Sequence, residues 1–123
     1  WFDAVLVGQS IAINGITDVV LTKLDVLDEL EEIQVCVGYE TKHKKYNYLP
    51  FDENIQNILM PIYETIPGWQ ESTFGLTSWD DLPKKAQNYI SFLESKIQKN
   101  ISIISTGPDR AHTIDRNNLL GNN

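Results

Sequence analysis

The stretch Ile16-Thr-Asp-Val-Val-Leu-Thr22 is rich in β-branched residues, and the polar run Lys23-Leu24-Asp25 follows it directly. A short run of this kind predicts a buried strand that ends in a loop. A second stretch has the same arrangement: Ile101-Ser-Ile-Ile104 predicts a buried strand and leads into Ser105-Thr-Gly-Pro108. Ligands of α/β sheets bind beyond the carboxyl ends of strands, so these two loops are the first candidates for a site.

Two helices are predicted around these strands. The apolar composition of residues 3–13 predicts a buried helix, which Asn14-Gly15 ends because Gly accepts the left-handed conformation found after helices. Apolar residues at helical spacing predict the clearest helix over residues 82–99. Residues 80–83 supply two candidate capping aspartates and a proline suited to the first turn.

The remaining segments predict further strands. Residues 33–39 and 63–69 are read as strands, the second of them ending in a Pro-Gly turn. A short acidic helix is expected within residues 25–32, and the basic cluster 42–45 is interpreted as a solvated hairpin turn or edge strand. This mixture predicts an α/β fold, namely the C-terminal part of a larger mixed sheet flanked by helices, with a pocket at the carboxyl ends of strands.

Composition excludes several classes of protein. The 123 residues carry a net charge of −7, which argues against nucleic acid and anionic membranes as partners. No apolar run approaches the roughly 20 residues of a membrane helix. The single cysteine, Cys36, is interpreted as a small buried residue and suits a reducing, cytoplasmic compartment. The chain begins at Trp1 and is expected to be a piece of a longer protein, with 115–123 as a polar tail.

The Lys23-Leu24-Asp25 loop suits recognition of a guanine ring. An Asp fixed at a strand end accepts two parallel hydrogen bonds, and guanine offers two adjacent donors that adenine lacks, its N1–H and 2-amino group. The methylene stem of Lys23 can lie along the ring. The pattern is similar to the Asn-Lys-x-Asp signature of GTP-binding proteins, with Thr22 in the Asn position. A Lys-x-Asp triplet is common, however, and helix capping by Asp25 remains the alternative.

The second loop strengthens the guanine hypothesis. Gly107 lets the backbone approach a ligand, so that N–H groups of Ser105, Thr106 or Gly107 could contact guanine O6, and Pro108 offers a flat apolar face. A plain turn is the alternative for these four residues. The sequence contains no glycine-rich phosphate loop and no recognisable Ser/His/Asp order. The acidic residues Asp28, Glu29, Glu31 and Glu32 are interpreted as a solvated helix face rather than a metal site.

Several longer runs resemble the adenylosuccinate synthetase family. The most specific are Leu21-Thr-Lys-Leu-Asp-Val-Leu-Asp28, Pro67-Gly-Trp-Gln-Glu-Ser-Thr73 and Ile104-Ser-Thr-Gly-Pro-Asp-Arg110. Shorter matches stand before and between them, in the family's order, and together all the matches span nearly the whole chain to about Ile114: Trp1-Phe2-Asp3, Asn14-Gly15, Val35-Cys36, Tyr48-Leu49-Pro50 and Asp81-Leu-Pro83. Apart from Tyr48-Leu49-Pro50, residues 42–59 match no motif of the family, nor does the tail after Ile114, and Gly8-Gln9 is unusual for its position in the first helix.

The resemblance implies an enzyme that uses GTP and Mg²⁺ to join IMP and aspartate into adenylosuccinate, in the cytoplasm and as a homodimer. It implies that Lys23, Leu24 and Asp25 read the guanine and that Ser105, Thr106, Gly107 and Pro108 close the base pocket. The family's catalytic residues, phosphate loop and metal site are expected upstream of Trp1, so no catalytic or metal residue is assigned here. Two alternatives stay open: a free-standing guanine-nucleotide module and a non-functional gene remnant.

Overall fold

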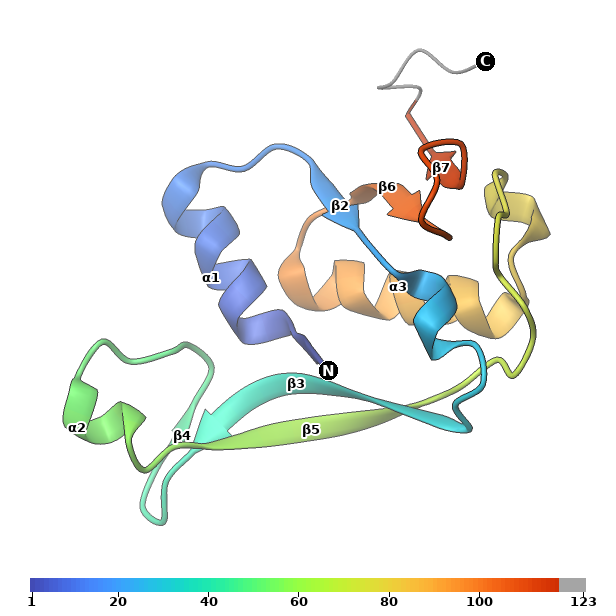
Figure 1. Cartoon of the computed structure of the whole chain (residues 1–123). Helices are drawn as coiled ribbons and strands as arrows, with labels where there is room; N and C mark the ends of the chain where they lie inside the picture. Colours follow the sequence, from blue (N-terminus) through green and yellow to red (C-terminus); the bar gives the residue numbers. More distant parts are fainter. Residues whose placement is uncertain (118–123) are drawn as a thin grey trace.

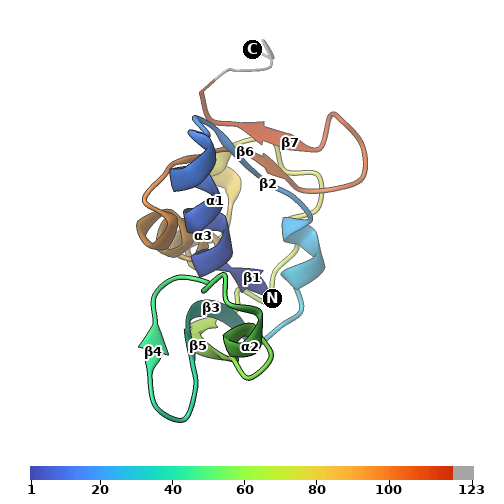
Figure 2. The same ribbon diagram turned by 90° about the vertical axis from the view of Figure 1, so that its left-hand side faces the viewer.

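The computed structural model describes residues 1–117. Two sheets enclose a layer formed by the helices α1 (Ala4–Asn14) and α3 (Lys84–Ile97), as the two views in Figures 1 and 2 show. The predicted mixed α/β arrangement is confirmed, and the strands of the described residues divide into two mixed sheets.

The first sheet is built around the long strand β3 (Glu32–Glu40). The short strand β1 (Phe2–Asp3) pairs with it in parallel, whereas β4 (Lys45–Tyr46) and β5 (Met60–Pro67) pair with it antiparallel. The expected strands 33–39 and 63–69 are therefore confirmed as one antiparallel pair. The basic cluster 42–45 forms the exposed turn between β3 and β4 and the first residue of the edge strand β4, also as expected.

The second sheet has the order β2 (Val19–Leu21), β6 (Ile101–Ser105) and β7 (Thr113–Asp115). The strands β2 and β6 are parallel and β6 and β7 antiparallel. The strand predicted over residues 16–22 is shorter than expected. It is also not fully buried, because β2 lies at the sheet edge and Val20 is 53% exposed.

The helix α3 supplies the middle of the core. Its predicted apolar stripe is buried: Ala86, Tyr89, Ile90, Leu93 and Ile97 are all at most 3% exposed. These side chains pack with Ile33 and Val35 of the first sheet and with Ile101 and Ile104 of the second. The helix α1 ends as predicted, with Gly15 in the left-handed conformation at φ 64°.

Two expectations about helices are wrong. Residues 25–32 form no acidic α-helix, because a short 3-10 helix, η1 (Leu24–Leu27), is followed by β3 from Glu32. Neither Asp80 nor Asp81 caps α3. Both lie in the 3-10 helix η2 (Trp79–Asp81), and Pro83 precedes α3 without a side-chain capping bond. The one-turn helix α2 (Glu53–Gln56), within the unplaced segment 42–59, was not predicted.

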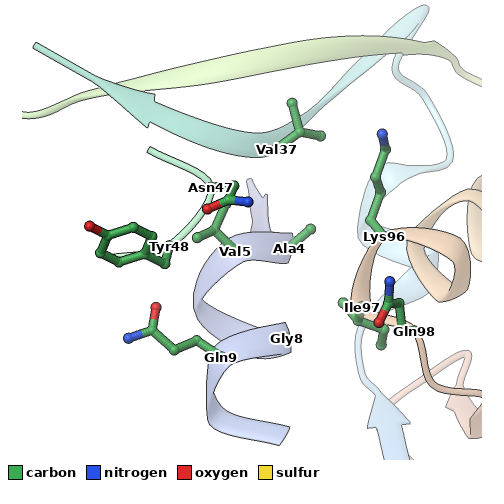
Figure 3. A pocket seen from close by; sticks show the side chains of 10 residues that line it. All are labelled: Ala4, Val5, Gly8, Gln9, Val37, Asn47, Tyr48, Lys96, Ile97 and Gln98. Atoms are coloured by element: carbon green, nitrogen blue, oxygen red, sulfur yellow. The ribbon is translucent and has the colours of Figure 1, made fainter. Parts of the chain in front are cut away.

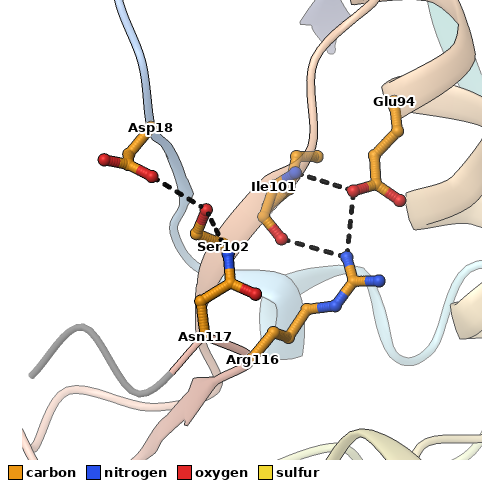
Figure 4. Close-up of polar contacts among 6 residues, drawn as sticks. All are labelled: Asp18, Glu94, Ile101, Ser102, Arg116 and Asn117. Atoms are coloured by element: carbon orange, nitrogen blue, oxygen red, sulfur yellow. Dashed lines mark hydrogen bonds and ion pairs between the residues drawn. The ribbon is translucent and has the colours of Figure 1, made fainter. Parts of the chain in front are cut away.

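The first residues of the expected polar tail are packed against the second sheet. Asp115 belongs to β7, and the Arg116 guanidinium lies 2.9 Å from the Glu94 carboxylate and donates to the Ile101 carbonyl at 3.0 Å (Figure 4). Asn117 donates to Ser102 Oγ at 3.2 Å. Residues 118–123 of that tail lie outside the described residues. Within residues 1–117, no helix is long and apolar enough to cross a bilayer.

Candidate nucleotide-binding site

The two candidate loops lie at one edge of one sheet. Leu21 pairs with Ile104 in the parallel register of β2 and β6, so both chains leave the sheet in the same direction. The next residues, Thr22 and Ser105, begin the two loops that the sequence singled out. The predicted convergence of the loops at neighbouring carboxyl ends therefore matches the observed topology.

The first loop turns sharply at Lys23. This residue has φ 60° and ψ 39°, a left-handed conformation that side chains other than Gly rarely adopt. Leu24 next to it is 1% exposed and belongs to the core, so only its backbone is available to a ligand. The 3-10 helix η1 begins without any side-chain capping bond, and Asp25 therefore does not cap it.

Asp25 lines a cleft of about 540 Å³. Within residues 1–117 its carboxylate has no hydrogen-bond or ion-pair partner, although the residue is half-buried. The cleft is lined by residues of the η1 region and of the segment after β5: Asp25, Val26, Asp28, Glu29, Gln70, Glu71, Ser72 and Phe74. Four of these are acidic, so the cleft suits a ligand edge that donates hydrogen bonds and repels phosphate.

The second loop uses most of its polar groups internally. Thr106 is fully buried: its N–H donates to the His112 carbonyl at 2.8 Å, its hydroxyl to the Leu76 carbonyl at 2.8 Å, and its own carbonyl accepts from Gly75 N–H at 3.0 Å. Ser105 Oγ donates to the Gly107 carbonyl at 3.1 Å. Among the described residues no acceptor is assigned to the Gly107 N–H, and Pro108 is exposed. Gly107 and Pro108 are thus the members open to a ligand, whereas Thr106 supports them.

The sequence placed Asp28 on a solvated helix face, which is wrong, because the Asp28 carboxylate is bound by two distant residues and organises the first loop. Its Oδ1 accepts from Trp69 Nε1 at 2.8 Å and from Thr73 Oγ1 at 2.6 Å, and its Oδ2 accepts from Thr73 N–H at 2.8 Å. Trp69 is 4% exposed and Thr73 is fully buried. The signal was present in the sequence, because these three residues lie in two of the three most specific family-like runs, but their contact spans more than 40 positions.

His112 was also not assigned, and it lies against the second loop. Its ring packs on Phe74 with centroids 4.9 Å apart. A methyl group added to Gly107 would lie 2.4 Å from His112 Nδ1, so only glycine fits beside this ring. The His112 N–H donates to the Asp109 carbonyl at 2.9 Å, which closes the turn after Pro108.

A different cleft, of about 400 Å³, lies between α1, α3 and the segment after β4 (Figure 3). Gly8 faces Ile97 there, and Gln9 binds the backbone of Leu49 twice, accepting from its N–H at 2.7 Å and donating to its carbonyl at 3.2 Å. Gly8 and Gln9 thus bring α1 close to α3 and hold the unplaced segment 42–59. These contacts account for the presence of Gly8 and Gln9 in α1, which the resemblance to the family did not explain.

Cys36 is a buried strand residue, as the sequence predicted. It is 4% exposed in β3, and its thiol donates to the Gly38 carbonyl at 3.3 Å. Burial, with the nearby Asp3 carboxylate, raises the pKa of the Cys36 thiol above its ordinary value. The reactive thiolate form is therefore disfavoured. Within residues 1–117, no group of three or more His, Cys, Asp or Glu side chains is placed to hold a metal ion.

Comparison with known proteins identifies the family. The family model for adenylosuccinate synthetase matches residues 1–114. Adenylosuccinate synthetase of Ehrlichia canis (strain Jake) is 50% identical over 118 residues, which are 96% of this chain and 27% of that protein. The enzyme of Coxiella burnetii (strain Dugway 5J108-111) is 50% identical over 116 residues, again 27% of its length.

A solved structure agrees with these sequence relatives. The structure of fully ligated adenylosuccinate synthetase from Plasmodium falciparum superimposes with a TM-score of 0.85 at 34% identity, covering 94% of this chain and 28% of that chain. The chain therefore spans little more than a quarter of the length of the relatives that it matches. Since the match extends over residues 1–114 and includes both candidate loops, the chain belongs to the adenylosuccinate synthetase family.

Proposed function

We propose that this chain supplies the guanine-binding part of an enzyme that joins IMP and aspartate with GTP. Lys23, Leu24 and Asp25 read the base, Leu24 through its backbone, and Ser105 to Pro108 close the pocket. The observation that carries the proposal is the half-buried Asp25 carboxylate, which has no partner within residues 1–117, on the loop beside Gly107 and Pro108.

The acidic cleft supports a base rather than a phosphate as the group bound here. Asp25, Asp28, Glu29 and Glu71 would repel a triphosphate, while the N1–H and 2-amino group of guanine suit a carboxylate. The phosphates of GTP therefore extend away from this cleft. Residues 1–117 contain no group of three or more His, Cys, Asp or Glu side chains placed to hold Mg²⁺.

The co-substrates, the metal ion, the oligomeric state and the compartment are proposed from membership of the family. IMP and aspartate are the co-substrates, Mg²⁺ accompanies GTP, and the whole enzyme acts as a homodimer in the cytoplasm. The chain spans 27% of the length of its relatives, and we place the groups that hold the γ-phosphate and deprotonate IMP in the rest of the enzyme. We therefore expect the 123-residue chain alone to bind guanine nucleotides weakly and to form no adenylosuccinate.

The test uses a chimaera in which this chain replaces the aligned segment of the Ehrlichia canis relative. The chimaera is expected to form adenylosuccinate from IMP, aspartate and GTP. The variant Asp25→Asn keeps an acceptor for N1–H but places an amide donor where xanthine has an oxygen. Its preference for GTP over XTP should fall by about a hundredfold or more, because sites built to pair a group reject ligands that lack it.

The activity of the chimaera and the base preference of its Asp25→Asn variant distinguish the proposed function from its alternatives. A folded chimaera without activity would favour the gene-remnant alternative, and an active chimaera would exclude it. An active chimaera whose Asp25→Asn variant keeps the original base preference would remove Asp25 from the base-reading role. Adenylosuccinate formed by the 123-residue chain alone would contradict the proposal that the reacting groups lie elsewhere.

A further inference from the structure

The segment Trp69–Leu76 connects the two candidate loops, and we call it the bracing segment. It follows β5 and contains most of the run Pro67–Thr73, which base recognition itself does not require. Among the described residues, no hydrogen bond joins residues 22–28 directly to residues 105–108. The sheet register fixes where the loops begin, so their spacing farther out depends on other contacts.

One end of the bracing segment holds the first loop. The Asp28 carboxylate accepts all three donors described above, from the Trp69 indole and from the N–H and hydroxyl of Thr73. Asp28 N–H donates in turn to the Asp25 carbonyl at 3.2 Å, within the same 3-10 turn. A carboxylate with three charge-assisted bonds is strongly held, so the bracing segment fixes the turn that carries Asp25.

The other end holds the second loop. Gly75 N–H donates to the Thr106 carbonyl, and the Leu76 carbonyl accepts from the Thr106 hydroxyl. Between the two ends, the ring of Phe74 packs on His112, whose carbonyl accepts from Thr106 N–H. Three separate contacts therefore connect the bracing segment to the loop that contains Gly107.

The bracing segment has a defined backbone shape. It contains two residues in the left-handed region, Gln70 at φ 49° and Gly75 at φ 75°. Buried Trp69 precedes the first bend and buried Thr73 lies between the two, so both ends of this stretch are held by the core. Non-glycine residues hold such conformations only where surrounding contacts determine them. The segment is therefore suited to act as a spacer of fixed length.

We propose that the bracing segment sets the spacing of the two guanine loops, and that Asp28 and Thr73 are positioning residues for base recognition. The inference rests on the proposed function, because positioning matters only if Asp25 reads guanine. A displacement of Asp25 by a fraction of an ångström weakens two parallel hydrogen bonds at once. Loss of the brace should therefore raise the KM for GTP and reduce the preference for GTP over ITP, whose base lacks the 2-amino group.

The test compares three threonine variants. Thr73→Val removes the hydroxyl that donates to Asp28 and keeps the shape, Thr73→Ser keeps the hydroxyl, and Thr41→Val is the matched control. Thr41 Oγ1 accepts from the N–H groups of His43 and Lys44 in the hairpin turn of the other sheet. KM, kcat and the GTP/ITP ratio are measured in the chimaera, and GDP and IDP affinities in the 123-residue chain by NMR titration.

Thr73→Val is expected to raise the KM for GTP about tenfold with little change in kcat, since the lost hydrogen bond is one to a charged group. Its GTP/ITP ratio should fall, whereas Thr73→Ser and Thr41→Val should match the parent. Phe74→Ala provides a second variant that does not threaten the core, because Phe74 is 55% exposed. It should raise the KM for GTP about threefold, because it removes both the ring contact with His112 and one wall of the cleft that Asp25 lines.

Failure of the inference and failure of the proposed function give different results. If Asp25→Asn changes base preference but Thr73→Val and Phe74→Ala lower only the melting temperature, the bracing segment is purely structural. If Asp25→Asn leaves base preference unchanged, the proposed function itself is wrong. A changed GTP/ITP ratio in Thr73→Val, restored in Thr73→Ser, supports the positioning role.

Discussion

Gly68 lies so close to Leu30 that no side chain fits between them. A methyl group added to Gly68 would lie 1.8 Å from the Leu30 carbonyl oxygen and 2.8 Å from its carbon. The Gly68 N–H donates to the Glu31 carbonyl at 2.8 Å, at the point where β3 begins and β5 has just ended. This approach of two backbones brings Trp69 to Asp28, and through it the bracing segment to the first loop.

The variant Gly68→Ala is expected to lose about 3 kcal/mol of unfolding free energy, because the clash is with backbone that has no rotamer to change. Urea denaturation of the 123-residue chain and of the variant measures the difference. A loss below about 0.5 kcal/mol would mean that the two backbones separate at little cost. The close approach would then not be needed to hold Asp28.

The variant Gly8→Ala also replaces glycine by alanine, but it is expected to raise the free energy of unfolding. A methyl group on Gly8 would lie 3.7 Å from Ile97 Cα and 4.0 Å from the Lys96 carbonyl, which is ordinary contact across the α1–α3 packing (Figure 3). Alanine in a helix interior is favoured over glycine by about 0.5–1 kcal/mol. The same denaturation experiment should therefore show a small gain, and a loss would indicate that the two helices have no room to adjust.

The pair Glu94–Arg116 is expected to stabilise the C-terminal end of the second sheet. The Arg116 guanidinium binds Glu94 and the Ile101 carbonyl and lies 4.1 Å from the Trp79 ring, while Glu94 also accepts from Ile101 N–H at 2.7 Å (Figure 4). Arg116→Ala should cost about 1–2 kcal/mol. A double-mutant cycle with Glu94→Gln should give a coupling of about 1 kcal/mol.

The pair Lys96–Glu64 supplies the contrast for that measurement. Its atoms are 3.6 Å apart and its side chains are 38% and 48% exposed. Exposed pairs contribute about 0–1 kcal/mol, so Lys96→Ala should change stability by about 0.5 kcal/mol or less. Equal losses for Arg116→Ala and Lys96→Ala would show that Arg116 acts only as another surface charge.

Tyr89 should make the fold sensitive to alkali. Burial raises the pKa of Tyr89 to about 12, whereas an unfolded tyrosine titrates near its ordinary value of about 10. Between these two pH values the unfolded chain releases the proton and the folded chain keeps it, so the stability present below pH about 10 is lost as the pH rises.

The variant Tyr89→Phe should therefore lose less stability between pH 9 and 11, by about 1 kcal/mol at pH 11. Part of the loss of stability at alkaline pH should remain in this variant because of Tyr39. The Tyr39 hydroxyl donates to Asp3, and its pKa is also raised mainly by burial. Tyr63→Phe is the control, because it removes one tyrosine hydroxyl from a position of β5 that is 43% exposed. Parallel denaturation curves of Tyr89→Phe and the parent at both pH values would contradict the prediction.

The sequence predicted the two loops because their signal is local. A short β-branched run followed by a polar turn marks a strand end wherever it occurs, and α3 was equally readable from its apolar period. The parallel register of Leu21 with Ile104 was expected only from a general rule about such sheets. Residues 25–32 were misread because helix propensity was outweighed by contacts of Asp28 with residues 41 and 45 positions away.

The residues that support the two loops could not be predicted from the sequence, because their roles depend on contacts with residues far away along the chain. Thr73 and Thr106 are ordinary polar residues in a sequence, and their roles appear only when each is buried against a partner far along the chain. Gln9 is similar, because its amide holds Leu49 from 40 positions away. Local patterns predict the two candidate loops, whereas the contacts that fix the position of these loops are tertiary.

Lys23 should separate stability from nucleotide binding. Its left-handed backbone suits glycine, so Lys23→Gly should leave stability unchanged or raise it by up to about 1 kcal/mol, while Lys23→Ala keeps the strain. Under the proposed function, both variants remove the methylene stem that lies along the base. Both should therefore weaken GDP binding about fivefold, since one or two buried methylenes are worth about 1 kcal/mol.

Gln98→Gly is the control for the backbone effect alone. Gln98 has φ 55° at the end of α3, where glycine is preferred, and it lies outside the candidate site. Its replacement should raise the melting temperature and leave GDP affinity as it was. If Lys23→Gly behaves like Gln98→Gly in both measurements, the strained residue at the end of β2 has no part in holding the base. If it gains stability and loses affinity, the strain is retained for the ligand.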